Sequence, residues 1–251
     1  MPIPPHAPGR FLAGVGLPFR GLATLARERR LWRYALLPVL LSAVALVASL
    51  ILLWPVSAKI LGLIWAEPSG VRILLWGAAH AVLFLVLALT AAAALPGLLA
   101  APFTDKLSAE VEALELGTVE PSGGFRRALT ETRISLAHAV MRTLLLLAGH
   151  AALLALLVVP VLGMAYPILA FLWSASWLAF DALDIPMARH LQSFSTMREA
   201  LRRVRPLSIG FGGVLALAFL VPLAGFLVVP VSAVAGTHLY CDLVRSGMIP
   251  R

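Results

Sequence analysis

The sequence contains one cysteine, Cys241, and only 13% of its 251 residues are charged. A single cysteine excludes an internal disulfide framework and the metal sites that use several thiolates. Soluble domains carry about 25% charged residues, because a wetted surface needs them. Acids are the scarcer sign, with 12 against 20 lysines and arginines, so the formal net charge is +8. The chain therefore has few of the charged residues that the surface of a soluble protein requires.

Enzyme motifs are also missing from the sequence. The two lysines, Lys59 and Lys106, complete no phosphate-binding loop, and there is no H-E-x-x-H or G-x-S-x-G stretch. We therefore predict that the protein is not an enzyme and holds no cofactor or metal. An intramembrane enzyme is the weakest of the candidate functions, since no catalytic set supports it.

Long apolar runs dominate the chain. Hydrophobic residues make up 61% of it, and four runs carry no charge: residues 34–54, 73–103, 144–180 and 208–240. A helix over residues 34–54 spans the ~30 Å hydrocarbon core at ~1.5 Å per residue. The basic residues flank these runs and form no separate basic domain, which argues against nucleic acid as the partner. We expect a single membrane domain over residues 1–251, with the lipid bilayer as its solvent.

The last two apolar runs are each interrupted near their middle by proline and glycine, which mark turns. Their first arms, residues 144–159 and 209–221, give only ~24 Å and ~20 Å of helix, less than the ~30 Å core. Each run therefore predicts a hairpin that dips into the bilayer, with turns at Pro160, Gly163 and Pro167 and at Pro222, Gly225 and Pro230.

Polar segments with one apolar helical face lie between the runs. Residues 1–33 predict an interfacial helix, weakened by glycine, with Phe11, Val15, Phe19 and Leu22 on one face. In residues 104–143, Phe103, Leu107, Val111 and Leu114 mark an apolar face, and the acids Asp105, Glu110, Glu112 and Glu115 predict a solvated one. A second amphipathic stretch there contains Arg126, Arg127 and Arg133.

Residues 181–207 predict another amphipathic helix. Its apolar face contains Phe194, Met197, Leu201 and Val204, and Thr196 with Glu199 predicts a capping box at its start. The predicted fold class is thus an all-α integral membrane protein. It has two long transmembrane helices, two hemi-penetrating helical hairpins and amphipathic cytoplasmic helices.

The distribution of lysine and arginine predicts the orientation in the membrane. Residues 55–72, a predicted polar connection, hold two of these residues, and 18 of the 20 lie on the other side if that connection is outside. Because basic loops stay in the cytoplasm, the N-terminus is predicted to be cytoplasmic.

Two groups of residues are candidates for function. His80, His150 and His238 lie within apolar runs, where an ionisable group carries either a proton or substrate role or a structural one. Arg29, Arg30 and Arg33 precede the first crossing, where free helix N–H groups and guanidinium forks favour an oxyanion. The alternative for these arginines is simple anchoring at the cytoplasmic surface.

Several segments resemble the CysZ sulfate permease family of bacterial inner membranes, which includes the etoposide-induced proteins of eukaryotes. The resemblance rests on four stretches in the same order as in the family: Arg33-Tyr-Ala-Leu-Leu-Pro38, Leu98-Leu-Ala-Ala-Pro-Phe103, Phe194-x-x-Met197-Arg198-x-Ala200-Leu201-Arg202 and Val229-Pro230-Val-x-x-x-x-Gly236. It implies a homo-oligomeric permease or channel that supplies sulfate, or a related oxyanion, for cysteine biosynthesis. A non-transporting scaffold or assembly protein of the same fold is the alternative.

The resemblance also places the sulfate site. The family's site is a Gly-hydrophobe-Arg-Arg stretch just before the first long helix, which aligns with Arg30-Leu31-Trp32-Arg33 here. Only Arg33 keeps its place, since Arg30 stands at the glycine position and Trp32 at the first arginine. Arg29 and Arg30 are the expected sources of replacement charge.

Overall fold

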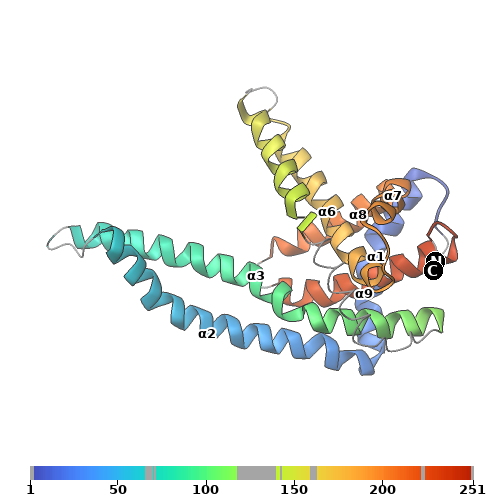
Figure 1. Cartoon of the computed structure of the whole chain (residues 1–251), viewed down its shortest axis with the longest axis horizontal. Coiled ribbons are helices and arrows are strands. Elements are labelled where there is room, and N and C mark those ends of the chain that lie inside the picture. The colour runs from blue at the N-terminus through green and yellow to red at the C-terminus, as the bar shows by residue number, and fades with distance from the viewer. Residues whose placement is uncertain are drawn as a thin grey trace.

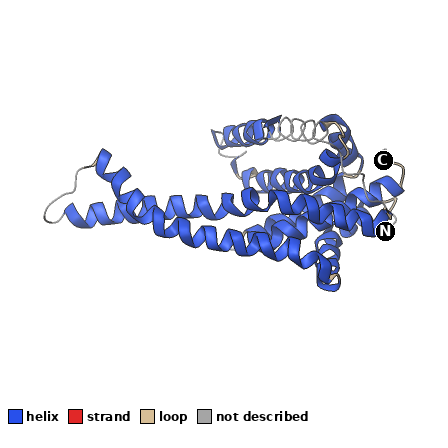
Figure 2. Ribbon diagram, turned by 60° about the horizontal axis from the view of Figure 1, so that its bottom comes forward, coloured by secondary structure: helices blue, strands red, loops and turns tan. Residues whose placement is uncertain are grey.

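The computed structural model describes residues 3–65, 70, 72–117, 140–141, 143–158, 163–221 and 224–249. Within these ranges the regular elements are all helical, as Figure 2 shows. They are α1 (Ala7–Arg27), η1 (Arg29–Leu31), α2 (Trp32–Ile64), α3 (Arg72–Leu116), η2 (Leu156–Val158), α6 (Tyr166–Arg189), α7 (Phe194–Arg203), α8 (Arg205–Phe219) and α9 (Gly225–Arg245). A short apolar helix, Thr143–Ala155, precedes η2. The all-α prediction is confirmed over these residues.

The α2–α3 hairpin projects far from the rest of the molecule (Figure 1). Its helices have 33 and 45 residues, or ~50 Å and ~68 Å of length, well beyond the ~30 Å membrane core. The predicted polar connection over residues 55–72 was wrong, because α2 continues through Pro55 and Lys59 to Ile64. Apolar residues surround Pro55, and in lipid an unpaired backbone costs more than one missing hydrogen bond in a continuous helix.

Among the described residues, four helical segments are long and apolar enough to cross a membrane: Arg29–Ile64, Arg72–Ala92, Tyr166–Arg189 and Gly225–Arg245. The outer faces of α2 and α3 carry large exposed apolar side chains, such as Leu40 (63% exposed) and Leu74 (77%). Water would not tolerate such continuous apolar faces, whereas lipid does. The protein is a multi-pass membrane protein.

The interruption in residues 144–180 separates two packed helices. The Thr143–Ala155 helix contacts α6 at Gly149, where an added Cβ would overlap the indole ring of Trp173. Pro167 is the second residue of α6, where its missing N–H has no partner to lose. Gly163 is helical and is followed by a two-residue turn, Met164–Ala165, before α6, and Pro160 lies outside the described residues.

The interruption in residues 208–240 is shorter than predicted. Gly225 is the first residue of α9, as a turn boundary requires, but Pro230 lies inside α9 and is buried. It is therefore a helix-interior proline and removes the backbone hydrogen bond that an N–H at this position would donate to the Phe226 carbonyl oxygen. The predicted turn was therefore wrong at Pro230, and Pro222 lies outside the described residues.

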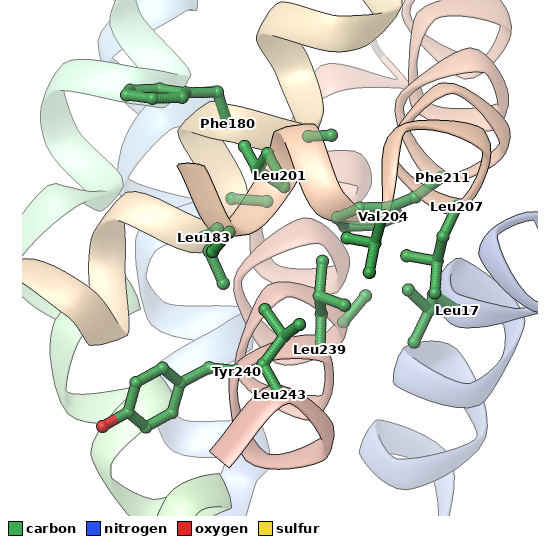
Figure 3. Packing of buried hydrophobic residues seen from close by; sticks show 14 of the residues in the cluster. Leu17, Phe180, Leu183, Leu201, Val204, Leu207, Phe211, Leu239, Tyr240 and Leu243 are labelled. Carbon is green, nitrogen blue, oxygen red and sulfur yellow. The ribbon is translucent and has the colours of Figure 1, made fainter. Parts of the chain in front are cut away.

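A hydrophobic core joins the bundle formed by α1, α6, α7, α8 and α9 (Figure 3). Leu17 of α1, Leu183 of α6, Leu201 of α7, Phe211 of α8 and Leu239 of α9 meet there. The predicted apolar face of α7 is confirmed, since Met197 and Val204 are fully buried. The predicted capping box was wrong: the N-cap is Ser193, whose hydroxyl accepts a hydrogen bond from the Thr196 N–H, 3.2 Å away.

The N-terminal helix is continuous despite its glycines. Its predicted apolar face, with Phe11, Phe19 and Leu22, is exposed, as an interfacial helix requires. The opposite face packs on α8 and α9, and a Cβ on Gly14 would overlap the carbonyl oxygen of Leu207. The glycine that lowers helix propensity here permits close backbone contact. The stretch with Arg126, Arg127 and Arg133 lies outside the described residues.

Candidate functional site

The start of α2 is fixed against α3 and α9 by a small apolar cluster. Leu31 is fully buried and packs with Ala35, with Leu107 and Val111 of α3, and with Val234 of α9. Because Leu31 and Ala35 share one face of the first turn, the neighbouring residues of α2 are held in a defined orientation beside α3. This packing positions Arg33 and Tyr34.

A pocket of about 230 Å³ lies between the first turns of α2 and the last third of α3. Arg33 and Lys106 line it, with Tyr34, Leu37, Pro102 and Phe103. The Arg33 guanidinium carbon is 4.6 Å from the centre of the Tyr34 ring, a cation–π distance that limits its freedom. In the part of the chain that the structure describes, no carboxylate pairs with Arg33 or Lys106. Two cations at one pocket, with no partner carboxylate among the described residues, favour an anion.

The structure does not bring the other two predicted arginines into this pocket. Arg29 and Arg30 lie in η1 and are exposed, and Arg30 Nε is 3.6 Å from Glu28 Oε2. Lys106 takes the place that Arg29 and Arg30 were predicted to fill, and sequence reasoning missed it. The sequence offered one indication of Lys106: it directly precedes Leu107, a residue of the predicted apolar face.

A partly buried network of charges joins α1, α3 and α9. Arg20 of α1 donates from Nη2 to Glu115 Oε1 at 2.7 Å and from Nη1 to Asp242 Oδ2 at 2.8 Å. Arg245 binds the other Glu115 oxygen at 2.6 Å, and His238 Nδ1 is 2.8 Å from Oε1. Two arginines thus balance two carboxylates around one histidine.

The ionisation of Glu115 follows from these contacts. Partial burial raises its pKa, but the hydrogen bond from Arg245 and the charge of Arg20 act more strongly together and lower the pKa to about 2. Glu115 therefore stays ionised at neutral pH and holds both arginines.

A second network joins α3 to the end of α6. Glu112 is only 3% exposed, and its carboxylate contacts Arg189 Nη1 at 2.9 Å and His190 Nε2 at 2.7 Å. Arg189 also contacts Asp105 at 3.2 Å, and the His190 ring stacks on Tyr240 of α9 at 5.1 Å. The predicted solvated acidic face of α3 was therefore wrong for Glu112, which faces α6, and for Glu115, which faces α1 and α9. Of the predicted apolar face, Leu107 and Val111 are buried, but Leu114 is 39% exposed.

The three predicted histidines all contact protein groups. His80 Nε2 lies 2.9 Å from Ser57 Oγ of α2, and its ring packs between Trp54 and Trp76. His150 Nδ1 lies 2.9 Å from the Leu146 carbonyl oxygen in its own helix. His238 Nε2 is 2.9 Å from the Thr24 hydroxyl. These contacts agree with structural roles, and the carboxylate beside His238 comes from another helix.

Comparison with known proteins identifies the family. The model of the family described as sulfate transporter CysZ/etoposide-induced protein 2.4 matches residues 17–230. The chain belongs to this family. The sulfate transporter CysZ of Pectobacterium atrosepticum is 33% identical over 149 residues, which are 59% of this chain and 54% of that protein. The protein of the same name from Salmonella typhimurium is 29% identical over 149 residues, 59% of each chain. The matched part thus spans little more than half the length of these relatives.

The departure from the CysZ-family motif has a structural consequence. Trp32, at the family's first arginine position, donates its indole N–H to the Leu25 carbonyl oxygen at 2.7 Å. That bond ties the end of α1 to the beginning of α2, so the position serves the junction between the helices. Arg33, the residue after Trp32, lines the pocket.

Proposed function

We propose that this protein is a membrane permease or channel for sulfate or a related oxyanion, and that the imported sulfate supplies cysteine biosynthesis. The observation that carries the proposal is the pocket between α2 and α3, where Arg33 and Lys106 converge from different helices. Membership of the CysZ family and the names of the bacterial relatives support sulfate as the anion.

The two cations suit an oxyanion in different ways. The Arg33 guanidinium offers a planar fork that binds two oxygens at once, whereas the Lys106 ammonium is a compact point charge. Both side chains are exposed, so a bound anion keeps part of its hydration and is held moderately. Moderate binding suits permeation, because an anion that binds too tightly does not leave.

We propose that the bundle and the N-terminus face the cytoplasm of a bacterial inner membrane. The excess of basic residues away from the α2–α3 tip supports this orientation. Single cysteines near Lys59 should react with a membrane-impermeant thiol reagent from the periplasm, and cysteines at Ser193 should not. Native Cys241 is buried and gives little background. The reverse labelling pattern would refute the orientation.

The two remaining helix pairs are proposed to dip into the bilayer from the cytoplasmic side. Their first arms, Thr143–Ala155 and Arg205–Phe219, provide ~20 Å and ~22 Å of helix, which is short of the ~30 Å core. Cysteines at Gly163 and Gly225 should therefore resist the same reagent from the periplasm. We also propose a homo-oligomer, as the family resemblance implies, which cross-linking in the membrane can test.

Sulfate flux in proteoliposomes tests the function. Radiolabelled sulfate should enter vesicles that contain the protein, and unlabelled sulfate should compete better than chloride or phosphate. Arg33→Ala should lower the flux tenfold or more, since charge-assisted bonds contribute ~1.5–3 kcal/mol each. Arg33→Lys keeps the charge without the fork and should fall between the two. Equal flux for all three proteins at matched abundance would contradict the proposal.

A non-transporting scaffold or assembly protein of the same fold is the second candidate. The use of Trp32 to join α1 to α2, in place of a family arginine, is the observation that favours it. The two functions differ in one phenotype: loss of a sulfate permease slows growth on limiting sulfate and spares growth on cysteine. A scaffold has no such dependence.

A further inference from the structure

An apolar groove of about 260 Å³ lies beside the junction of α1 and α2, on a different side of α2 from the Arg33 pocket. Its walls come from three helices: Leu22 and Ala26 of α1, Trp32 and Leu36 of α2, and Leu227 and Val231 of α9. Most of these side chains are exposed, although all are apolar. The groove is thus a preformed apolar surface at the edge of a membrane span.

The groove runs along one face of α2 into the membrane span. Trp32, Leu36 and Val39 line it along one face of α2, over ~10 Å of helix that runs into the span Arg29–Ile64. The Trp32 indole N–H is fixed on the Leu25 carbonyl oxygen, so the ring stands as a rigid wall. Tryptophan favours the depth of the lipid headgroups, with apolar residues deeper in the bilayer.

Positive charge marks the polar end of the groove. The Trp32 backbone N–H binds the Arg29 carbonyl oxygen in η1, and side chains three residues apart in such a turn lie nearly in line. Arg29 is exposed and precedes the groove residue Trp32 by one such turn, although it does not itself line the groove. Among the described residues, no carboxylate pairs with Arg27 or Arg29, and Arg30 forms an exposed ion pair with Glu28 at 3.6 Å, which a bound phosphate would have to replace.

We propose that this groove binds one anionic phospholipid, with its phosphate at Arg29 and Arg30 and an acyl chain along Trp32, Leu36 and Leu227. Charge and apolar surface follow the same order as headgroup and chain in such a lipid. Arginine forks match phosphate geometry, and each basic residue near an anionic headgroup contributes to binding. The site also gives a role to the two arginines that do not line the sulfate pocket.

The lipid occupies the seam where α1, α2 and α9 meet. It therefore stabilises the junction that holds the base of the α2–α3 hairpin on the bundle. The proposal does not rest on sulfate transport, because the two sites share no lining residue. Failure of either one leaves the other intact.

Titration of the detergent-solubilised protein with phosphatidylglycerol, followed by native mass spectrometry, tests the proposal. The first lipid should bind at least tenfold more tightly than phosphatidylcholine. Arg29→Gln with Arg30→Gln should weaken it roughly tenfold or more, and Arg198→Gln with Arg202→Gln, on exposed positions of α7, should change it less than twofold. Ala26→Phe keeps every charge, fills the groove and should also weaken binding, provided that its melting temperature without lipid is unchanged.

Three results would overturn the proposal. Equal affinity for both lipids would mean that the groove binds acyl chains without selecting an anionic headgroup. Equal phosphatidylglycerol binding by the arginine pair variant and its control would remove the headgroup site. Full competition by glycerol phosphate, which has the phosphate without the chains, would show a site for free anions in place of a lipid.

Discussion

The α2–α3 hairpin and the bundle at its base bury their apolar residues to very different extents. In the most apolar stretches of α2 and α3, only 17% and 6% of residues are buried inside the protein, against 72% in α9. The hairpin helices contact each other and leave their outer faces to lipid, while α9 is surrounded by α1, α3 and α6. Apolar sequence alone therefore does not distinguish a lipid-facing helix from a central one.

Polar contacts differ between the two regions in the same way. In the hairpin, His80 of α3 has neutral hydrogen-bonded contacts with Ser57 Oγ and the Trp54 carbonyl oxygen of α2. In the bundle, Glu112 and Glu115 each form ion pairs with basic side chains of other helices. Lipid provides no hydrophobic driving force between helices, so close packing and polar contacts must hold them together. The bundle depends on its charges far more than the hairpin does.

The largest expected effect comes from Glu112, which should separate the two regions most clearly. Glu112→Ala leaves His190 without its carboxylate and Arg189 with Asp105 alone, and breaking a buried pair costs ~3–5 kcal/mol. Unfolding in detergent should report that loss. Glu199→Ala removes exposed pairs with Arg202 and Arg203 and should cost less than ~1 kcal/mol. Equal losses would mean that the bundle does not depend on its buried charge.

Replacing glycine by alanine should change the stability in opposite directions in the bundle and in the hairpin. A Cβ on Gly212 would overlap the Ala175 carbonyl oxygen, so Gly212→Ala forces α8 from α6 at a cost of ~1–3 kcal/mol. Gly62 of α2 has open space at the same atom, and Gly62→Ala should raise helix stability by up to ~1 kcal/mol. Thermal unfolding of both variants measures the contrast, and a destabilised Gly62→Ala protein would contradict the open hairpin face.

Lowering the pH should reduce the stability of the bundle by protonating Glu115. This effect should be smaller than those of the substitutions above. The pKa of this group falls from 4.5 to about 2 on folding. A lowered pKa contributes stability above pH 4.5, and that contribution is lost as the pH falls from 4.5 towards 2. The melting temperature should therefore decline over this window, and Glu115→Gln should flatten the decline. An unchanged profile in the variant would exclude Glu115 as the acid-sensitive group.

The same contrast explains which features the sequence predicted. Charge-free runs and proline–glycine breaks are local, so they located the long helices and the interruptions near Gly163 and Gly225. The end of α2 was misplaced because Pro55 and Lys59 resemble a loop in composition, although the apolar context keeps them helical. The pairing of Glu112 with Arg189 joins residues far apart in the chain, and no local pattern reveals it.

The candidate site was predicted in part for the same reason. Arg33 could be found because it precedes a long helix and keeps its place in the family motif. Lys106 comes from α3, and only the packing of Leu31 on Leu107 brings it to Arg33. Arg29 and Arg30 are close to Arg33 in sequence, yet the short η1 turn directs them elsewhere.

Sulfate affinity of three single variants tests the central claim most directly. Arg33→Ala and Lys106→Ala each remove a cation that lines the pocket, whereas Arg29→Ala removes one that does not line it. Calorimetry in detergent should show at least a tenfold loss of sulfate affinity for the first two variants. Arg29→Ala should stay within twofold of the unmodified protein. The same loss in all three, or no loss in any, would contradict a specific anion site between α2 and α3.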